Sequence, residues 1–326
     1  MAEITLVEAV DLALAYEMQA DPSVVILGED IAKNGGVFRA TQGLLDKFGP
    51  DRVRDTPLAE SMIGGLAIGM AIEGLKPVAE FQFMGFLYPA LDQIINHAAR
   101  IRNRTRGHLS CPVVFRAPFG SGIHAPEHHS ESTEALLAHI PGLRVVIPSS
   151  PVRAYGLLLA SIRDPDPVIF LEPSRLYRFA KQEVEDNGKA LPLDKCFTLR
   201  EGKDITLVTW GAMIKETMAA AEVIVKEGID VEIIDVATLK PLDMETILSS
   251  VEKTGRCVII HEAPKTGGVG ADISAQIAEK ALLSLKAPVM RITGYDTIVP
   301  YARLEKYYIP SVPQIVDAIK KTMEFA

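Results

Sequence analysis

The chain has 326 residues, of which 48% are hydrophobic and 23% are charged, and its formal net charge is −8. This composition is typical of a globular protein with a large core and excludes a disordered chain. The negative charge argues against a nucleic-acid-binding protein, because phosphate recognition needs clustered Lys and Arg.

The three cysteines, Cys111, Cys196 and Cys257, lie far apart in the chain and form no C-x-x-C pair. This spacing argues against a disulfide framework or a zinc site and favours a reducing compartment. Neither a secretory signal nor a run of about eighteen apolar residues is present. We therefore expect a soluble, cytoplasmic protein without a membrane segment.

The first half of the chain alternates short apolar runs with helical patterns. Thr5 and Glu8 form a capping box that predicts a helix at the start of the chain. Strands are expected at 24–27, 78–81, 112–117, 143–148 and 168–172, and helices at 61–73, 91–101 and 151–163. This alternation predicts a parallel sheet covered on both faces.

Residues 173–202 break the pattern and are predicted to be a linker between two α/β domains. Beyond them, strands are expected at 205–210, 231–236, 256–262 and 288–292, and helices at 214–227, 244–253, 271–285 and 312–323. In the first half, Gly65 and Gly69 recur at spacing four within the helix expected at 61–73. Glycine costs stability inside a helix, so this spacing indicates close packing against another helix.

Glu60 precedes the glycine-containing helix. It is either an acid favoured by the helix dipole or a partly buried acid able to exchange a proton with a ring nitrogen. Four aromatic residues follow at Phe81, Phe83, Phe86 and Tyr88. They are either core residues or one wall of a site for a flat heteroaromatic ligand, with Gln82 as its polar partner.

His124, His128 and His129 lie in a run of turn-forming residues after a strand, where α/β proteins often place functional groups. Their spacing fits no zinc pattern, so an acid–base or substrate-positioning role is favoured over metal ligation, with a surface loop as the alternative. The chain has neither a Walker loop nor a G-x-G-x-x-G motif. Acid–base groups without a phosphate cradle imply that a partner supplies the cradle.

An ordered series of motifs resembles one family. It comprises Gly28-Glu-Asp, Gly35-Gly-Val-Phe-Arg, Asp51-Arg-Val-Arg-Asp-Thr-Pro-Leu-Ala-Glu60, Glu80-Phe-Gln-Phe, Phe115-Arg-Ala-Pro-Phe-Gly, Pro141-Gly-Leu-Arg-Val-Val-Ile-Pro, Ile162-Arg-Asp-Pro-Asp-Pro-Val, Glu252-Lys-Thr-Gly-Arg and His261-Glu-Ala-Pro-Lys-Thr-Gly-Gly. The series is similar to the beta subunits of the thiamine-diphosphate-dependent decarboxylating component of 2-oxo acid dehydrogenase complexes. The resemblance spans about residues 3–324. The Gly-Asp-Gly and Asn-Asn pattern that holds magnesium diphosphate in thiamine enzymes is absent.

The resemblance implies a two-domain α/β fold. A transketolase-like pyrimidine-binding domain is expected at 1–180, a linker at 181–202 and a transketolase C-terminal domain at 203–326. The alpha subunit of an alpha2beta2 heterotetramer is expected to hold the diphosphate and magnesium. A dihydrolipoyl acyltransferase core is the second partner, which the C-terminal domain is expected to dock without supplying a catalytic residue.

The resemblance also implies roles for residues at matching positions. Glu60 matches the acid that hydrogen-bonds the pyrimidine ring nitrogen, and Leu58, Gln82 and Phe86 match the lining of the pyrimidine pocket. His129 matches the histidine implicated in reductive acylation of the lipoyl group. A structural potassium, or another monovalent cation, is implied at Val113, Ser161, Ile162, Asp164 and Asp166. Asp166 stands where many relatives have Asn, which changes the charge of that ligand set.

Pyruvate is the expected substrate, because the segment from Gln82 to Phe86 resembles pyruvate-type beta subunits. Motifs of the C-terminal domain resemble branched-chain 2-oxo acid and acetoin types instead. Two further alternatives are a non-catalytic scaffold subunit and a self-contained thiamine enzyme. The missing diphosphate motif argues against the self-contained enzyme.

Overall fold

The computed structural model describes residues 2–325, which divide into two compact units. The first unit takes the described residues up to Phe119 together with Leu136–Leu193, and the second takes Gly120–Ala135 and the described residues from Asp194 onward. The main boundary thus falls between Leu193 and Asp194, inside the segment expected to be a linker. The sequence did not predict that Gly120–Ala135 belongs to the second unit.

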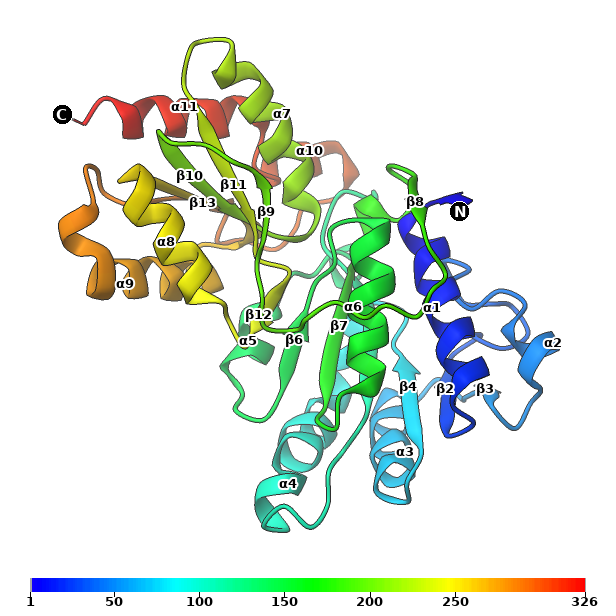
Figure 1. The fold of residues 1–326 in the computed structure, drawn as a ribbon. Coiled ribbons are helices and arrows are strands. Elements are labelled where there is room, and N and C mark those ends of the chain that lie inside the picture. The colour runs from blue at the N-terminus through cyan, green and yellow to red at the C-terminus, as the bar shows by residue number, and fades with distance from the viewer. Residues whose placement is uncertain (1, 326) are drawn as a thin grey trace. The chain divides into compact units, whose positions relative to one another are not determined.

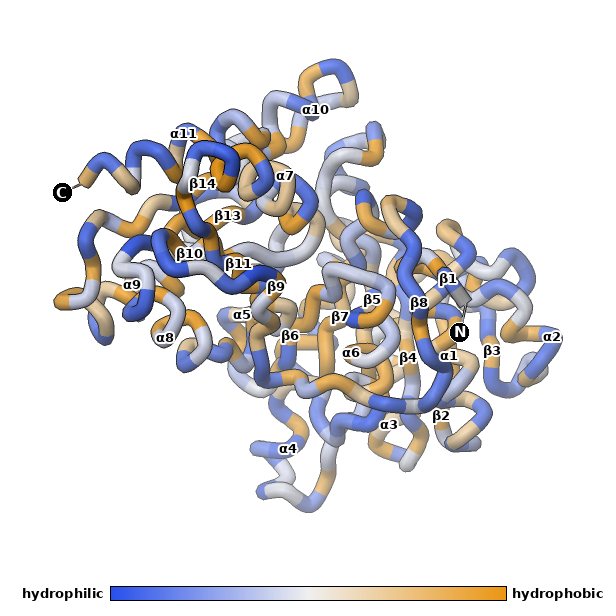
Figure 2. The backbone as a smooth tube through the Cα atoms, turned by 45° about the horizontal axis from the view of Figure 1, so that its top comes forward, coloured by the Kyte–Doolittle hydropathy of each residue, from blue (hydrophilic) through white to orange (hydrophobic). Residues whose placement is uncertain are grey.

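The sheet of the first unit contains six parallel strands in the order β6-β7-β5-β4-β2-β3. Their bounds are β2 Val24–Gly28, β3 Val53–Asp55, β4 Lys76–Glu80, β5 Val114–Phe119, β6 Arg144–Val146 and β7 Val168–Pro173. Every residue of β5 and β7 is buried, as expected for strands of a covered parallel sheet. The tube of Figure 2 runs largely in the hydrophobic colour along β6 and β7.

Helices α1 (Leu6–Ala20) and α6 (Pro151–Arg163) lie side by side in the first unit (Figure 1). The predicted capping box is confirmed, because the backbone N–H and the hydroxyl of Thr5 both donate to Glu8 Oε2 at 2.7 Å. Apart from α3, which has 13 residues, the remaining elements of this unit are short. They are β1 Ala2–Ile4, α2 Leu44–Phe48, α3 Glu60–Ile72, α4 Ile101–Arg104, α5 Glu134–His139, which runs across the boundary with the second unit, and β8 Gln182–Val184, which pairs with β1.

Residues 91–101 are helical throughout, as expected, but they do not form one regular α-helix. A 3-10 segment Met84–Ala90 leads into a short α-helical stretch, a π-helical turn Gln93–His97 and a second 3-10 turn before α4. A Cβ at Gly64 or Gly65 of α3 would meet Gln93 at 3.3–3.4 Å, so this segment packs directly on the glycine face of α3. Such tertiary packing distorts helical geometry in a way that hydrophobic periodicity does not encode.

The sheet of the second unit has the order β14-β13-β10-β11-β9 and is parallel except for the edge strand β9. Its strands are β9 Phe197–Arg200, β10 Ile205–Thr209, β11 Val231–Asp235, β13 Cys257–Pro264 and β14 Met290–Gly294, and the unit also contains the short strand β12 Thr238–Lys240. Its helices are α7 Ile214–Val225, α8 Met244–Thr254, α9 Val269–Ala281, α10 Ala302–Tyr308 and α11 Val312–Met323.

In Figure 1, α7 and α11 lie together on one face of this sheet, and α8 and α9 lie together on the other. The core between α7, α11 and the sheet consists of fully buried aliphatic side chains such as Ile224, Ile233 and Ile319. The predicted alternation of strands and helices is therefore confirmed in both units. Among residues 2–325, no helix is long and apolar enough to span a bilayer.

Candidate active site

Glu60 is the first residue of α3 and lies half-buried near the carboxyl end of β3. The loop before it is fixed by backbone contacts, since Thr56 N donates to Gly28 O at 2.9 Å and Ala32 N donates to Asp55 Oδ1 at 2.7 Å. Within this loop the side chain of Leu58 is 81% exposed. An acid and an apolar side chain therefore stand accessible at the same edge of the sheet.

Glu29, which the sequence analysis quoted only as part of a family motif, lies beside Glu60. It follows β2, is 6% exposed, and its Oε1 has no hydrogen-bond partner among the described residues. Burial raises the pKa of Glu29, and the charge of Glu60 raises it further. Its position directly after a buried parallel strand is the sequence signal that could have identified it.

The aromatic segment divides into core residues and accessible residues. Phe81 and Phe83 are buried, and Phe81 packs on Phe115 with ring centroids 6.2 Å apart. Gln82 and Phe86 are only half-buried, and Phe86 meets Phe83 edge to face at 5.6 Å. The core interpretation therefore holds for Phe81 and Phe83, whereas Gln82 and Phe86 remain available to a ligand.

We call Leu58, Glu60, Gln82 and Phe86 together the half-site. These residues follow β3 and β4, the two strands that flank β2 in a parallel sheet. Because the carboxyl ends of parallel strands meet at one edge, the half-site and Glu29 share that edge of the first unit.

A buried ionic network lies at the carboxyl ends of β4, β5 and β7. The guanidinium of Arg116, 2% exposed, donates to both oxygens of Glu172 at 2.6 and 3.0 Å and to Glu80 Oε2 at 2.9 Å. The Tyr177 hydroxyl donates to Glu172 Oε2 at 2.6 Å. Burial and the Glu172 charge raise the pKa of Tyr177 well above its ordinary value, so the phenol stays a donor. Glu80 immediately precedes the aromatic segment, so the network fixes its start.

The residues expected at a cation site lie at the opposite, amino-terminal edge of the same sheet. Val113 precedes β5, and its carbonyl accepts from Val168 N at the start of β7. Ser161 and Ile162 are buried in the last turn of α6, where helix carbonyls lack intrahelical donors. Asp164 caps that helix and accepts from Asp166 N at 2.8 Å.

Both aspartates of this set already have cationic partners. Arg144 Nε lies 2.8 Å from Asp164 Oδ2, and Arg102 Nε lies 2.6 Å from Asp166 Oδ1. Within residues 2–325, no group of three or more His, Cys, Asp or Glu side chains could hold a metal ion. Any cation here would therefore depend mainly on backbone carbonyls, as expected for a hard monovalent ion.

The three predicted histidines lie in the segment Gly120–Ala135, which we call the histidine loop and which belongs to the second unit. Residues Glu127–His129 form a 3-10 turn in which His128 is exposed and His129 is half-buried. His128 Nδ1 lies 3.3 Å from Glu127 Oε1, and the backbone N–H of His129 donates to Pro126 O at 2.9 Å.

Buried aromatic and acidic side chains surround the end of this loop. Trp210 donates from Nε1 to Glu134 Oε1 at 3.1 Å and stacks on His261 with ring centroids 5.0 Å apart. Burial raises the pKa of Glu134 to about 7. Burial also lowers the pKa of His261 to about 4, which keeps the imidazole neutral. The second unit thus contributes buried titratable residues that sequence reasoning missed.

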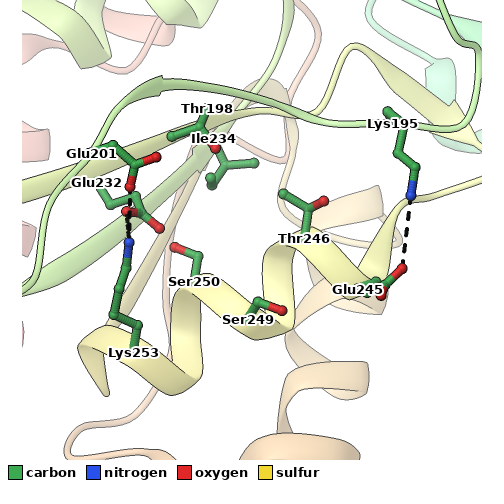
Figure 3. A pocket seen from close by; sticks show the side chains of 10 residues that line it. All are labelled: Lys195, Thr198, Glu201, Glu232, Ile234, Glu245, Thr246, Ser249, Ser250 and Lys253. Carbon is green, nitrogen blue, oxygen red and sulfur yellow. Dashed lines mark hydrogen bonds and ion pairs between the residues drawn. The ribbon is translucent and has the colours of Figure 1, made fainter.

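A separate hollow of about 510 Å³ opens on the second unit beside α8 and β9 (Figure 3). Its two lysines are already paired, Lys253 with Glu201 and Glu232, and Lys195 with Glu245 at 3.9 Å. None of the residues predicted for the site lines it. The hollow is therefore distinct from the candidate site, and its three glutamates outnumber its two lysines.

Comparison with known proteins covers the whole chain. Residues 2–180 match the family described as "Transketolase, pyrimidine binding domain", and residues 194–315 match "Transketolase, C-terminal domain". The chain is 48% identical over 325 residues, 100% of both chains, to the "Pyruvate dehydrogenase E1 component subunit beta" of Staphylococcus aureus (strain Mu50 / ATCC 700699). It is 47% identical over the same length to the protein of that name from Staphylococcus epidermidis (strain ATCC 12228 / FDA PCI 1200).

Among solved structures, the fold is similar to that of a "Split gene transketolase, inactive beta4 tetramer". The TM-score is 0.81 at 25% sequence identity, and the match covers 99% of both chains. The expected two-domain transketolase-like fold is thereby confirmed.

Proposed function

Because the chain belongs to the beta-subunit family of the thiamine-dependent E1 component of 2-oxo acid dehydrogenase complexes, of the pyruvate dehydrogenase type, we propose that it completes a thiamine diphosphate site on an alpha subunit. The observation that carries the proposal is the full-length 48% identity, in a chain that keeps an accessible acid at the start of α3. The reaction is oxidative decarboxylation of pyruvate with acetyl transfer to a lipoyl group, and it requires the alpha subunit.

The half-site suits an aminopyrimidine. Glu60 offers a carboxyl, Gln82 an amide and Phe86 an accessible ring face, which together match a flat heteroaromatic with polar edges. The buried, unpartnered Oε1 of Glu29 supplies a second acid beside Glu60. No phosphate-binding motif accompanies these groups, so the alpha subunit would hold the diphosphate and its magnesium.

When bound, thiamine diphosphate supplies the electron sink for decarboxylation of a 2-oxo acid. Glu60 would hydrogen-bond the pyrimidine ring nitrogen and exchange a proton with it. Leu58 and Phe86 would cover the apolar faces of the ring and exclude water. Gln82 would orient its polar edge.

His129 is proposed to act in acyl transfer. In that step the lipoyl disulfide would be the oxidant: one sulfur would bond to the two-carbon group as the S–S bond breaks, and the other sulfur would take up a proton. The two-carbon group would lose its hydroxyl proton and leave the cofactor as an acetyl thioester. A histidine side chain can act as the general acid that supplies the proton to the sulfur.

The glycine face of α3 supports the proposed alpha2beta2 assembly. Gly64 and Gly65 are used within the chain, whereas a Cβ at Gly69 would meet no atom within 4 Å. Met62 and Leu66 of the same helix are 39% and 44% exposed. This partly apolar surface beside the half-site is where a subunit could pack closely. We further propose that the tetramer binds a dihydrolipoyl acyltransferase core and that the protein is cytoplasmic.

A structural monovalent cation is proposed at Val113, Ser161, Ile162, Asp164 and Asp166. The carbonyls at the end of α6 and the Val113 carbonyl provide the donors. Potassium should raise the thermal midpoint of the chain relative to a tetramethylammonium buffer of equal ionic strength. An unchanged midpoint would count against the site.

The substrate is tested by 2-oxo-acid-dependent dye reduction in the assembled tetramer, with thiamine diphosphate and magnesium present. Pyruvate should be turned over in preference to 3-methyl-2-oxobutanoate. A preference for the branched acid would move the chain to the branched-chain complex. No turnover of either acid by a well-formed tetramer would favour an acetoin-type substrate or the scaffold alternative.

A further inference from the structure

The amino-terminal part of the histidine loop has an unusual backbone. Gly120, Gly122 and His124 all have positive φ, at 88°, 94° and 61°. Glycine tolerates this region, but a residue with a side chain does so at a cost, so His124 must be held there by surrounding contacts.

A single carboxylate provides those contacts. Glu305 of α10 is 1% exposed. Its Oε1 accepts from the backbone N–H of Gly122, and its Oε2 accepts from His124 N at 3.1 Å and lies 3.0 Å from His124 Nδ1. A buried carboxylate is expensive unless its oxygens are satisfied. Among the described residues, the hydrogen-bond partners of both oxygens all lie in the loop.

A second carboxylate, that of Glu262, holds Ser121, the residue before Gly122. Glu262 at the end of β13 accepts from the N–H and the hydroxyl of Ser121 at 2.9 and 3.0 Å. A Cβ at Gly120 would lie 2.8 Å from Glu262 Oε1, so the loop approaches this carboxylate as closely as glycine allows. Together with the Trp210–Glu134 hydrogen bond, these contacts fix both ends of the loop within the second unit.

We propose that Glu305 is a positioning residue: by holding Gly122 and His124, it sets the conformation in which the loop presents His129 for acyl transfer. The role of His129 in this proposal rests on the proposed function. The contacts by which Glu305 holds Gly122 and His124, which we call the tether, do not depend on it. Within the second unit, Glu305 bonds to Gly122 and His124 and not to His129. It acts through the backbone, five residues before His129.

The test uses Glu305→Gln in the assembled tetramer. The amide keeps the size of the side chain, but its NH2 group meets a loop donor where an oxygen stood. We expect acetylation of a free lipoyl domain to fall about five- to tenfold, no more than removal of His129 itself would cause, while dye-linked decarboxylation of pyruvate changes less than about twofold. Hydrogen exchange of a peptide covering 120–131 should accelerate, with β10 unchanged.

Glu232→Gln is the matched control. Glu232 is a buried carboxylate of the same unit that accepts from Gly202 N at 3.2 Å and pairs with Lys253, away from the loop. It should leave the ratio of the two activities and the loop exchange unchanged. If Glu305→Gln does not assemble, Glu305→Asp keeps the charge, withdraws it by one methylene and should show the same selective loss.

Three outcomes would overturn the inference. Unchanged exchange of 120–131 would remove the tether. Faster exchange with both activities intact would remove the positioning role, and equal loss of both activities would make Glu305 merely structural. A wild-type tetramer without 2-oxo acid activity would instead refute the proposed function, and the exchange measurement would still decide whether Glu305 holds the loop.

Discussion

The half-site of the first unit and the histidine loop of the second hold their functional side chains in different ways. Leu58, Gln82 and Phe86 remain accessible on loops that follow parallel strands. The histidine loop is fixed by buried carboxylates, Glu262 and Glu305, which accept from its backbone. The side chains of the half-site are thus left accessible, whereas the backbone of the loop is held by carboxylates of its own unit.

The largest effect should come from removing the acid of the half-site. Glu60→Gln in the assembled tetramer should lower pyruvate turnover by about 10²–10⁴-fold, the range of general acid–base catalysis, because the amide cannot exchange the proton. Assembly should persist, since Glu60 is half-buried and accessible. Dye reduction measures the loss, and Glu73→Gln, an exposed residue at the other end of α3, is the control. Near-wild-type turnover would mean that another group activates the cofactor.

The next effect tests the support of the half-site rather than its chemistry. Arg116→Met leaves Glu80 and Glu172 buried without their cation, which should cost about 3–5 kcal/mol in free energy of unfolding. Urea unfolding of the purified chain measures this loss. Arg54→Met, which removes an exposed pair with Asp51, should cost at most about 1 kcal/mol. Similar costs for both variants would contradict the proposed role of the network.

The next prediction concerns Glu134 in the histidine loop, whose ionisation should make the stability of the protein depend on pH. Burial raises the pKa of Glu134 from 4.5 to about 7, so the folded state holds its proton more tightly than the unfolded state. Stability is therefore full below pH 4.5 and falls as pH rises toward 7. Glu134→Gln keeps the acceptor for Trp210 and removes this loss, which amounts to about 3 kcal/mol at most.

Thermal midpoints measured from pH 4 to pH 8 test this prediction. The Glu134→Gln variant should match the wild type near pH 4 and exceed it at pH 8. Glu245→Gln, whose side chain is exposed, should follow the wild type throughout. A constant difference between Glu134→Gln and the wild type at all pH values would contradict the raised pKa.

The smallest effect should come from the histidine loop, and it tests whether this loop serves acyl transfer rather than decarboxylation. His129→Ala should lower acetylation of a free lipoyl domain about tenfold and change dye-linked decarboxylation less. The neighbouring His128, whose side chain is 63% exposed, provides the control His128→Ala. Equal losses in both assays would mean that the histidine loop also serves decarboxylation.

Local sequence patterns predicted most of the fold. Helices 151–163 and 312–323 have the predicted bounds, because their caps and apolar periodicity are encoded within the segments themselves. The helix expected at 91–101 is present, but its π and 3-10 turns were not predicted, and this segment packs on the glycines of α3. Periodicity carries no information about such a neighbour.

Site residues were predictable only where a motif names them. Glu60 and His129 could be proposed from the resemblance, and their roles remain proposals. Glu305 could not be found, because it meets Gly122 across 183 positions of the chain and looks like an ordinary helical glutamate in the sequence. The roles of Glu134 and Glu262 could not be predicted for the same reason, since only folding brings them into contact with their partners in the second unit.

The most direct test of the central claim is calorimetric titration of thiamine diphosphate with magnesium, first into this chain alone and then into the assembled tetramer. We predict no saturable binding to the chain alone and one site per alpha–beta pair in the tetramer. Saturable binding to the chain alone would contradict the claim, because the chain would then carry its own phosphate cradle.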